Sequence, residues 1–216
     1  MPFKPDFISF LFLAMVVTSY IVTIIYAINN WRYSLYGKLI SFYLLVFSHG
    51  LLVHSVIANG LLIYFPHLSR TAILMLLMMN PISFLAMDKG LLNKKMTSLD
   101  ILHFVPALIY LLNFLPFYFL GTNEKIELIK NMELSKFNEG WFLPPFTVPV
   151  MSFFQIIIYF IWIHSKFLVN FSSQLNKNSL FKIRFFWLYT IFQIVPIYLM
   201  AYNFYGENLN SPINAV

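Results

Sequence analysis

The chain has 216 residues, of which 60% are hydrophobic and only 10% are charged. Soluble domains carry about 25% charged residues, so this composition excludes an ordinary water-soluble enzyme and a free nucleic-acid-binding domain. The 25 Phe, 13 Tyr and 4 Trp residues exclude a disordered chain. Cysteine is absent, which excludes disulfides, thiolate metal sites and cysteine nucleophiles. The sequence therefore predicts a membrane protein.

Six apolar stretches are long enough to be membrane-spanning helices. A helix needs roughly 20 mostly apolar residues to cross about 30 Å of hydrocarbon. The stretches do not alternate between apolar and polar residues as the strands of a membrane barrel do. We therefore predict an all-α fold, a polytopic transmembrane helix bundle that forms a single domain over residues 1–216. The predicted spans are 7–28, 39–63, 71–87, 101–120, 146–163 and 185–204.

The first stretch is predicted to be a retained helix rather than a cleaved signal peptide. Only Lys4 precedes it, and no small-x-small cleavage site occurs between Ser19 and Asn30. Its apolar run is also longer than the hydrophobic region of a signal peptide, which has about 7–15 residues.

The basic residues are divided unequally between two sets of connections. The connections after the first, third and fifth spans hold nine Lys and Arg residues and two acidic ones. The remaining connections and the two ends hold five basic and six acidic residues. Cytoplasmic loops carry the excess of Lys and Arg, so we predict a bacterial inner-membrane protein with both termini on the outer, periplasmic side. The expected partners are the lipid bilayer and other membrane or envelope proteins, and no nucleic acid.

The connection at residues 121–144 differs from the others because it carries seven charges of alternating sign. An apolar stripe of Ile126, Ile129, Met132 and Phe137 accompanies them and predicts a short amphipathic helix on the outer membrane interface. Two interpretations remain open, a solvated connector and an external lid or docking surface. The candidate partner surface consists of Glu124, Glu127, Lys130, Glu133, Lys136 and Trp141, the last as an interfacial anchor.

The centres of the six predicted spans contain no Asp, Glu, Lys or Arg. Such residues mark proton relays and ion pathways in membranes, so we expect no enzyme, no catalytic residue, no cofactor and no metal. His49 and His54 are about 140° apart around a helix and cannot share a metal as an i, i+4 pair would. Interhelical hydrogen bonding, a ligand-sensing pocket and a metal or haem site between helices remain open for them. The candidate polar pocket consists of Ser48, His49, His54, Ser55 and Asn59.

Several short motifs follow one another in the middle of the chain. Pro81 precedes a connection that holds three lysines, LHFVP at 102–106 opens the fourth predicted span, and LPFY at 115–118 closes it. With these motifs, residues 70–190 resemble the membrane-embedded N-terminal half of bacterial AraC-type one-component transcriptional regulators. The FLA stretch at 84–86 departs from the aromatic Leu-Tyr-Tyr-like stretch usual in that family.

The resemblance implies a membrane sensor with seven spans, an outer N-terminus and a cytoplasmic helix-turn-helix domain. The sequence as given has six predicted spans and no such domain, so we expect no DNA binding by that route. We predict a non-catalytic sensor or receptor-like membrane module. A structural or accessory subunit of a larger envelope complex, such as secretion or transport machinery, is the alternative. A small-solute transporter or lipid-active enzyme is a further one, and would need His49, His54 or His103.

Overall fold

The computed structural model describes residues 7–91, 94–130, 141–143 and 147–173. The regular elements within these ranges are all helical and no strand occurs among them, which confirms the all-α class. The chain divides into two compact units, residues 1–152 and residues 153–216.

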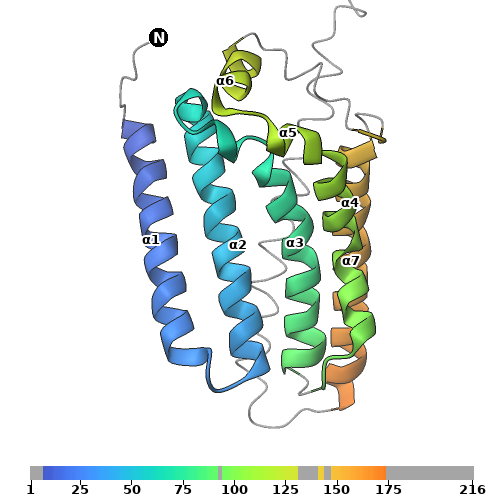
Figure 1. The fold of residues 1–216 in the computed structure, drawn as a ribbon. Coiled ribbons are helices and arrows are strands. Elements are labelled where there is room, and N and C mark those ends of the chain that lie inside the picture. The colour runs from blue at the N-terminus through green and yellow to red at the C-terminus, as the bar shows by residue number, and fades with distance from the viewer. Residues whose placement is uncertain (1–6, 92–93, 131–140, 144–146, 174–216) are drawn as a thin grey trace, which may run out of the picture. The chain divides into compact units, whose positions relative to one another are not determined.

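Three apolar helices, α1 (Phe7–Asn30), α2 (Leu35–Ala58) and α3 (Thr71–Leu85), lie side by side in the first unit (Figure 1). At 1.5 Å per residue, a helix of the length of α1 or α2 extends about 36 Å, enough to cross a bilayer. With the turn that continues α3 to Lys89, these are the described helices that are long and apolar enough to span a membrane.

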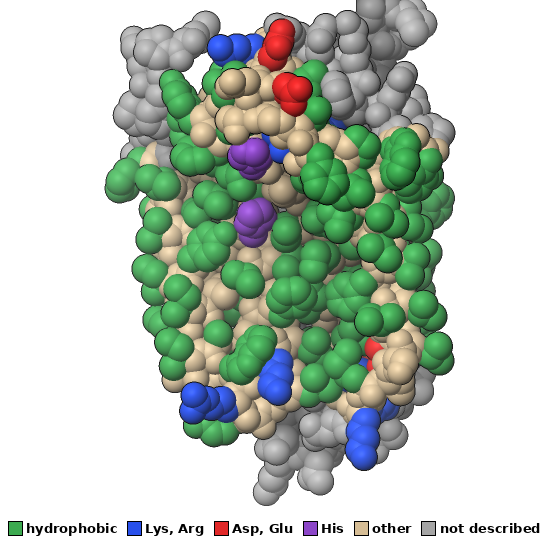
Figure 2. Space-filling view, viewed as in Figure 1, with side chains coloured by type: hydrophobic (Ala, Val, Ile, Leu, Met, Phe, Trp, Pro, Cys, Tyr) green, Lys and Arg blue, Asp and Glu red, His purple; other side chains and the backbone are tan. Residues whose placement is uncertain are grey.

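The helix α1 exposes most of its large apolar side chains and buries Val16 and Thr23. Thr23 is buried and its hydroxyl lies 3.1 Å from that of Ser48 on α2. Large side chains at helical spacing are instead 50–65% exposed along the helix; these are Phe10, Leu13, Val17, Ile21 and Ile24. On the side of the molecule turned to the viewer, Figure 2 shows hydrophobic side chains over the middle of the helices and charged ones toward their ends. Small and polar residues between helices with apolar residues outside are typical of membrane helix packing.

The connection between α1 and α2 is tight because position 37 is a glycine. Ser34 caps α2 by accepting a hydrogen bond from the Gly37 N–H at 2.9 Å. A Cβ atom at Gly37 would lie 2.4 Å from the carbonyl oxygen of Asn30. The two helices therefore approach one another at a distance that only glycine permits. The helix α2 begins four residues before the predicted span and ends at Ala58, before the left-handed Gly60.

A π-helical turn, η3 (Ala86–Leu91), continues α3 into an ionic network. Lys94 Nζ lies 3.1 Å from Asp88 Oδ1, and Lys89 Nζ lies 3.2 Å from Asp100 Oδ1. Asp100 also caps the 3₁₀ helix η4 (Ser98–Phe104), where its carboxylate accepts a hydrogen bond from the Thr97 N–H at 2.6 Å. The network therefore joins the end of α3 to the start of the next helical segment.

The fourth predicted span, 101–120, is not one continuous helix, and the prediction was wrong in that respect. The segment consists of η4, then α4 (Val105–Asn113), then α5 (Leu115–Phe119). Proline has no N–H and its ring clashes with the carbonyl four residues earlier. Pro116 lies in the first turn of α5, directly after the break at Phe114. The apolar helix therefore runs only over Ser98–Asn113, shorter than a span.

Of the last two predicted spans, the structure describes the fifth. The helix α7 (Thr147–Ser173) covers the fifth predicted span, 146–163, and continues ten residues beyond it. Its apolar part, Val150–Lys166, is shorter than a full span by the same length measure. The sixth predicted span, 185–204, lies outside the described residues. Three helices of the described part thus fit a membrane crossing, fewer than the six predicted from the sequence.

Candidate functional site

The predicted polar pocket on α2 is not a single cluster, because its residues make hydrogen bonds in different directions. Ser48 faces Thr23 of α1, whereas His49 Nε2 lies 3.3 Å from the hydroxyl of Thr71 at the start of α3. Asn59 donates to the carbonyl of Ser55 on its own helix at 2.7 Å. His54 is exposed. Ser48 and His49 therefore connect neighbouring helices, and Asn59 bonds back to the last turn of α2.

No group of three or more His, Asp or Glu side chains that could hold a metal ion occurs in the part of the chain that the structure describes. The ionic network around Asp88 and Asp100 is occupied by Lys89 and Lys94. Polar side chains also meet at the opposite end of the helices, where the α2–α3 connection lies.

A short helix, α6 (Thr122–Lys130), packs there on two 3₁₀ turns of the α2–α3 connection (Figure 1). These turns are η1 (Leu61–Ile63) and η2 (Pro66–Leu68). The Glu124 carboxylate accepts a hydrogen bond from the Gly121 N–H at 2.7 Å and closes the first turn of α6. Glu124 at its start and Lys130 at its end both suit the helix dipole. We call α6 together with η1 and η2 the α6 platform.

Lys125 holds α6 on this surface. Its side chain is 1% exposed, and its Nζ donates a hydrogen bond to the carbonyl of Tyr118 at 3.0 Å. Nζ also lies 3.0 Å from His67 Nδ1 and 5.4 Å from the centre of the Phe117 ring. Burial lowers the pKa of Lys125 because it removes water from the charged form. Ile126 and Ile129, which belong to the apolar stripe predicted from the sequence, are both partly buried.

His67 makes a second contact with the same helix. Its Nε2 lies 3.1 Å from the hydroxyl of Thr122, one turn before Lys125. The imidazole therefore bridges two α6 side chains, Thr122 and Lys125, and joins α6 to the connection between α2 and α3.

Arg70 ties this connection to α4. Its backbone has φ +67°, a left-handed conformation that is uncommon for residues other than glycine. The hydroxyl of Tyr110 donates to the Arg70 carbonyl at 2.7 Å, and the guanidinium carbon lies 4.5 Å from the centre of the Phe114 ring. Burial lowers the pKa of Arg70, although the nearby Tyr110 and Tyr118 partly oppose this. The connection is thus held by α4 from one side and by α6 from another.

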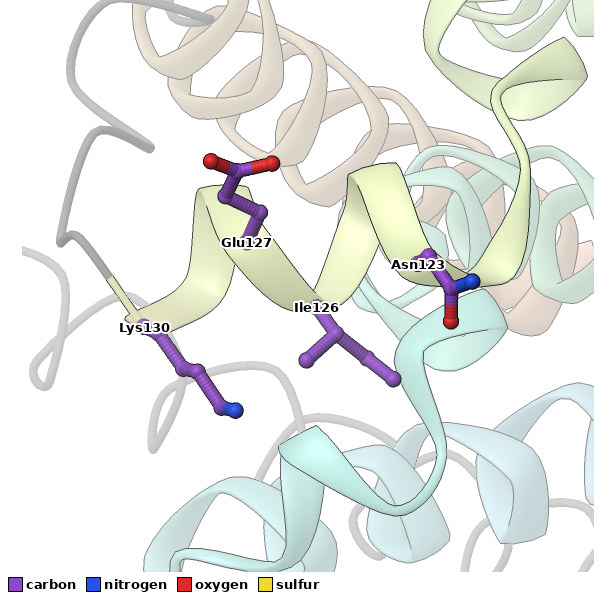
Figure 3. A pocket seen from close by; sticks show the side chains of 4 residues that line it. All are labelled: Asn123, Ile126, Glu127 and Lys130. Carbon is purple, nitrogen blue, oxygen red and sulfur yellow. The ribbon is translucent and has the colours of Figure 1, made fainter.

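The predicted partner surface is partly described. Glu124, Glu127, Lys130 and Trp141 are exposed, while Glu133 and Lys136 lie outside the described residues. An open pocket of about 280 Å³ is lined by Asn123, Ile126, Glu127 and Lys130. Figure 3 shows Asn123, Ile126 and Lys130 pointing from one side of α6 and Glu127 from the other. Within the described part of the chain, Glu127 and Lys130 make no ion pair with each other.

Three residues of this site were not predicted from the sequence, namely His67, Arg70 and Lys125. His67 and Arg70 lie in a connection between predicted spans and Lys125 within a run of alternating charges, where solvent exposure is the usual outcome. One pattern could have indicated Lys125. It lies four residues before Ile129 and so shares a face with an apolar residue.

No family model matches the sequence, and no match was found among curated proteins or among solved structures.

Proposed function

We propose that the chain is a multi-pass membrane module of the sensor or receptor kind, without catalytic activity. Its α6 platform would receive a ligand or partner on the outer side of a bacterial inner membrane. The membrane part of this proposal is supported by the three long apolar helices and by the exposed apolar face of α1. The resemblance of residues 70–190 to the membrane half of AraC-type regulators supports the sensor part.

One observation carries the proposal, namely the contact of His67 with two side chains of α6. Because His67 belongs to the α2–α3 connection, a ligand that moves α6 also pulls on the ends of two predicted spans. A ligand shifts a conformational equilibrium only when it binds one state more tightly. The open pocket at Asn123, Ile126, Glu127 and Lys130 is where such a difference in binding would arise.

The charge distribution supports the proposed placement in the membrane. The proposal has the α6 platform on the periplasmic side and the α1–α2 connection, with Arg32 and Lys38, in the cytoplasm. The six-span arrangement with both termini outside remains part of this proposal.

A photo-crosslinking experiment in native membranes tests the sensor proposal. The photoreactive residue replaces Glu127 on the platform, Tyr33 at the opposite end or Ile24 on the exposed face of α1. We expect an adduct of defined mass from position 127, none from position 33, and loss of the adduct when Lys130→Glu is added. Absence of a ligand or protein adduct at position 127 would contradict the proposal.

The accessory-subunit alternative is favoured by a different observation. Only 11% of the most apolar 18-residue stretch of α1 is buried, so most of that helix is open to lipid or to another membrane chain. The same experiment distinguishes the two functions. Stoichiometric adducts to one membrane protein from position 24, with none from position 127, would favour the subunit.

A further inference from the structure

We propose that Lys125 and His67 form a pH-sensitive latch that holds α6 on η2 and releases it in mildly acidic surroundings. The latch involves the same surface as the proposed function. Its test measures the position of α6 alone, so failure of the latch and failure of the sensor proposal can be told apart.

The contact between Lys125 and His67 can hold only a limited number of protons while α6 is docked. A hydrogen bond between two nitrogen atoms 3.0 Å apart needs one donor and one acceptor. A charged Lys125 donates to the lone pair of His67 Nδ1, and the other ring nitrogen then carries the hydrogen and donates to the Thr122 hydroxyl. The pair therefore carries one positive charge when α6 is docked.

One more proton disrupts this contact. Protonated imidazole has a hydrogen on both nitrogen atoms and can accept no hydrogen bond. An imidazolium and an ammonium group would then face each other at 3.0 Å, where like charges repel strongly. Lys125 cannot turn into water while α6 stays in place, since its side chain is 1% exposed. His67 is exposed and can turn into water, so the repulsion breaks the bond that holds η2 to α6.

No neighbouring side chain compensates for a second charge at this contact. The turn η1 contributes leucine and isoleucine side chains, and Arg70 lies over the same Phe117 ring as Lys125, at 5.2 Å. From α5 the contact is the neutral carbonyl of Tyr118. The nearest acid along α6, Glu124, is engaged by the Gly121 N–H. Among the described residues, no carboxylate lies within ion-pair distance of Lys125 or His67.

The direction of the pH effect follows from proton binding in the two states. The undocked state binds more protons, because Lys125 regains water and His67 can ionise beside it. Docking is therefore strongest at alkaline pH and weakens as the pH falls. The lowered pKa of Lys125 has the same sign. Histidine side chains ordinarily change charge between about pH 5 and 8, so the test compares pH 8 with pH 5.

Distance measurements between spin labels test the latch in the full chain, reconstituted in lipid nanodiscs. The chain has no cysteine, so Glu127→Cys on α6 and Ile57→Cys on α2 give a unique labelled pair. We expect one short distance at pH 8 and a second, longer population at pH 5. The ratio of docked to undocked molecules should fall by at most about tenfold per pH unit, because one proton is linked. An unchanged distance distribution between pH 8 and pH 5 would overturn the latch.

Two variants identify the residues responsible. His67→Gln keeps an acceptor that cannot ionise, and Lys125→Met keeps an apolar stem without a charge. His67→Gln should show the short distance at both pH values, and the docked fraction of Lys125→Met, whatever its size, should not change between them. A pH response of wild-type size in either variant would assign the movement to another group and contradict the proposal. If glutamine fails to hold α6 at any pH, the comparison of Lys125→Met with wild type decides alone.

Discussion

Asn113 fixes the return of the chain from the connection that carries α6. Its backbone carbonyl accepts a hydrogen bond from the Trp141 N–H at 2.9 Å. Its side-chain Oδ1 accepts from the N–H groups of Phe142 and Leu143, at 3.0 Å and 2.9 Å. Because Asn113 is 1% exposed, water cannot easily take over these bonds. One amide group therefore holds residues 141–143 against the end of α4.

Replacing Asn113 by alanine should destabilise the fold and release residues 141–143. The change leaves two backbone N–H groups without their acceptor, which costs about 1–3 kcal/mol when such groups are buried. Unfolding in detergent micelles measures the loss, and faster hydrogen exchange at Phe142 and Leu143 locates it. The matched control Asn123→Ala removes an exposed amide and should change stability by less than about 0.5 kcal/mol. Equal effects of the two variants would show that the Asn113 bonds contribute little.

The hydrogen bonds of Asn113 and Lys125 could not be predicted from the sequence. Asn113 is recognisable as a polar residue within an apolar segment, but its partners lie 28 or more positions away. Lys125 is one of seven alternating charges, and such a run predicts a solvated face. Its burial depends on the η2 turn and on the Tyr118 carbonyl, which only the folded chain brings together.

At the scale of the elements, glycine decides how closely α1 and α2 approach. Gly37→Ala should lower the free energy of unfolding by about 1–3 kcal/mol, because the new methyl group overlaps a backbone carbonyl. Gly50→Ala lies on the same helix with nothing within 4 Å of its Cβ. It should be neutral or stabilising by about 0.5–1 kcal/mol, since alanine favours a helix. Unfolding of both variants in the same detergent tests the contrast, and a stable Gly37→Ala protein would refute the close approach.

The connection between α3 and α4 depends on the charge of Asp100. Burial raises the pKa of Asp100, but hydrogen bonds from Thr97 and Lys89 outweigh it, and the pKa lies below its ordinary value of 3.8. A carboxylate with a lowered pKa stabilises the fold above its ordinary pKa and loses this effect as the pH falls through the lowered one. Protonation in acid should therefore loosen η4.

Hydrogen exchange near Thr97 measures this loosening as the pH is lowered. In wild type the protection of that amide should decrease in acid, relative to amides in α2. Asp100→Asn should remove the pH dependence, whereas Glu127→Gln, at an exposed carboxylate, should leave it intact. An acid response that persists in Asp100→Asn would assign it to a different group.

The sequence predicted the elements well where apolar runs are uninterrupted and poorly where proline divides them. The prediction for the first span is off by two residues at its end, since α1 ends at Asn30. The fourth predicted span was expected to be one helix because hydropathy gives Pro116 no special weight. Proline nevertheless interrupts a helix, and the segment is divided just before Pro116. The start of α2 was missed since Leu35–Lys38 is less apolar, yet the Ser34 cap begins the helix there.

At the scale of the whole molecule, the account rests on a membrane lying between the α6 platform and the α1–α2 connection. Tyr33 in that connection is 83% exposed, and Asn123 on α6 is exposed as well. Without native cysteine, Tyr33→Cys and Asn123→Cys each provide a unique thiol.

The decisive measurement is the reaction of these two variants with a membrane-impermeant maleimide in sealed spheroplasts. The account predicts that Cys at position 123 reacts from outside, while Cys at position 33 reacts only after the membrane is permeabilised. The membrane crossing is contradicted if both thiols react from the same side, or if no protein is found in the membrane fraction. Either result would also contradict the proposed function.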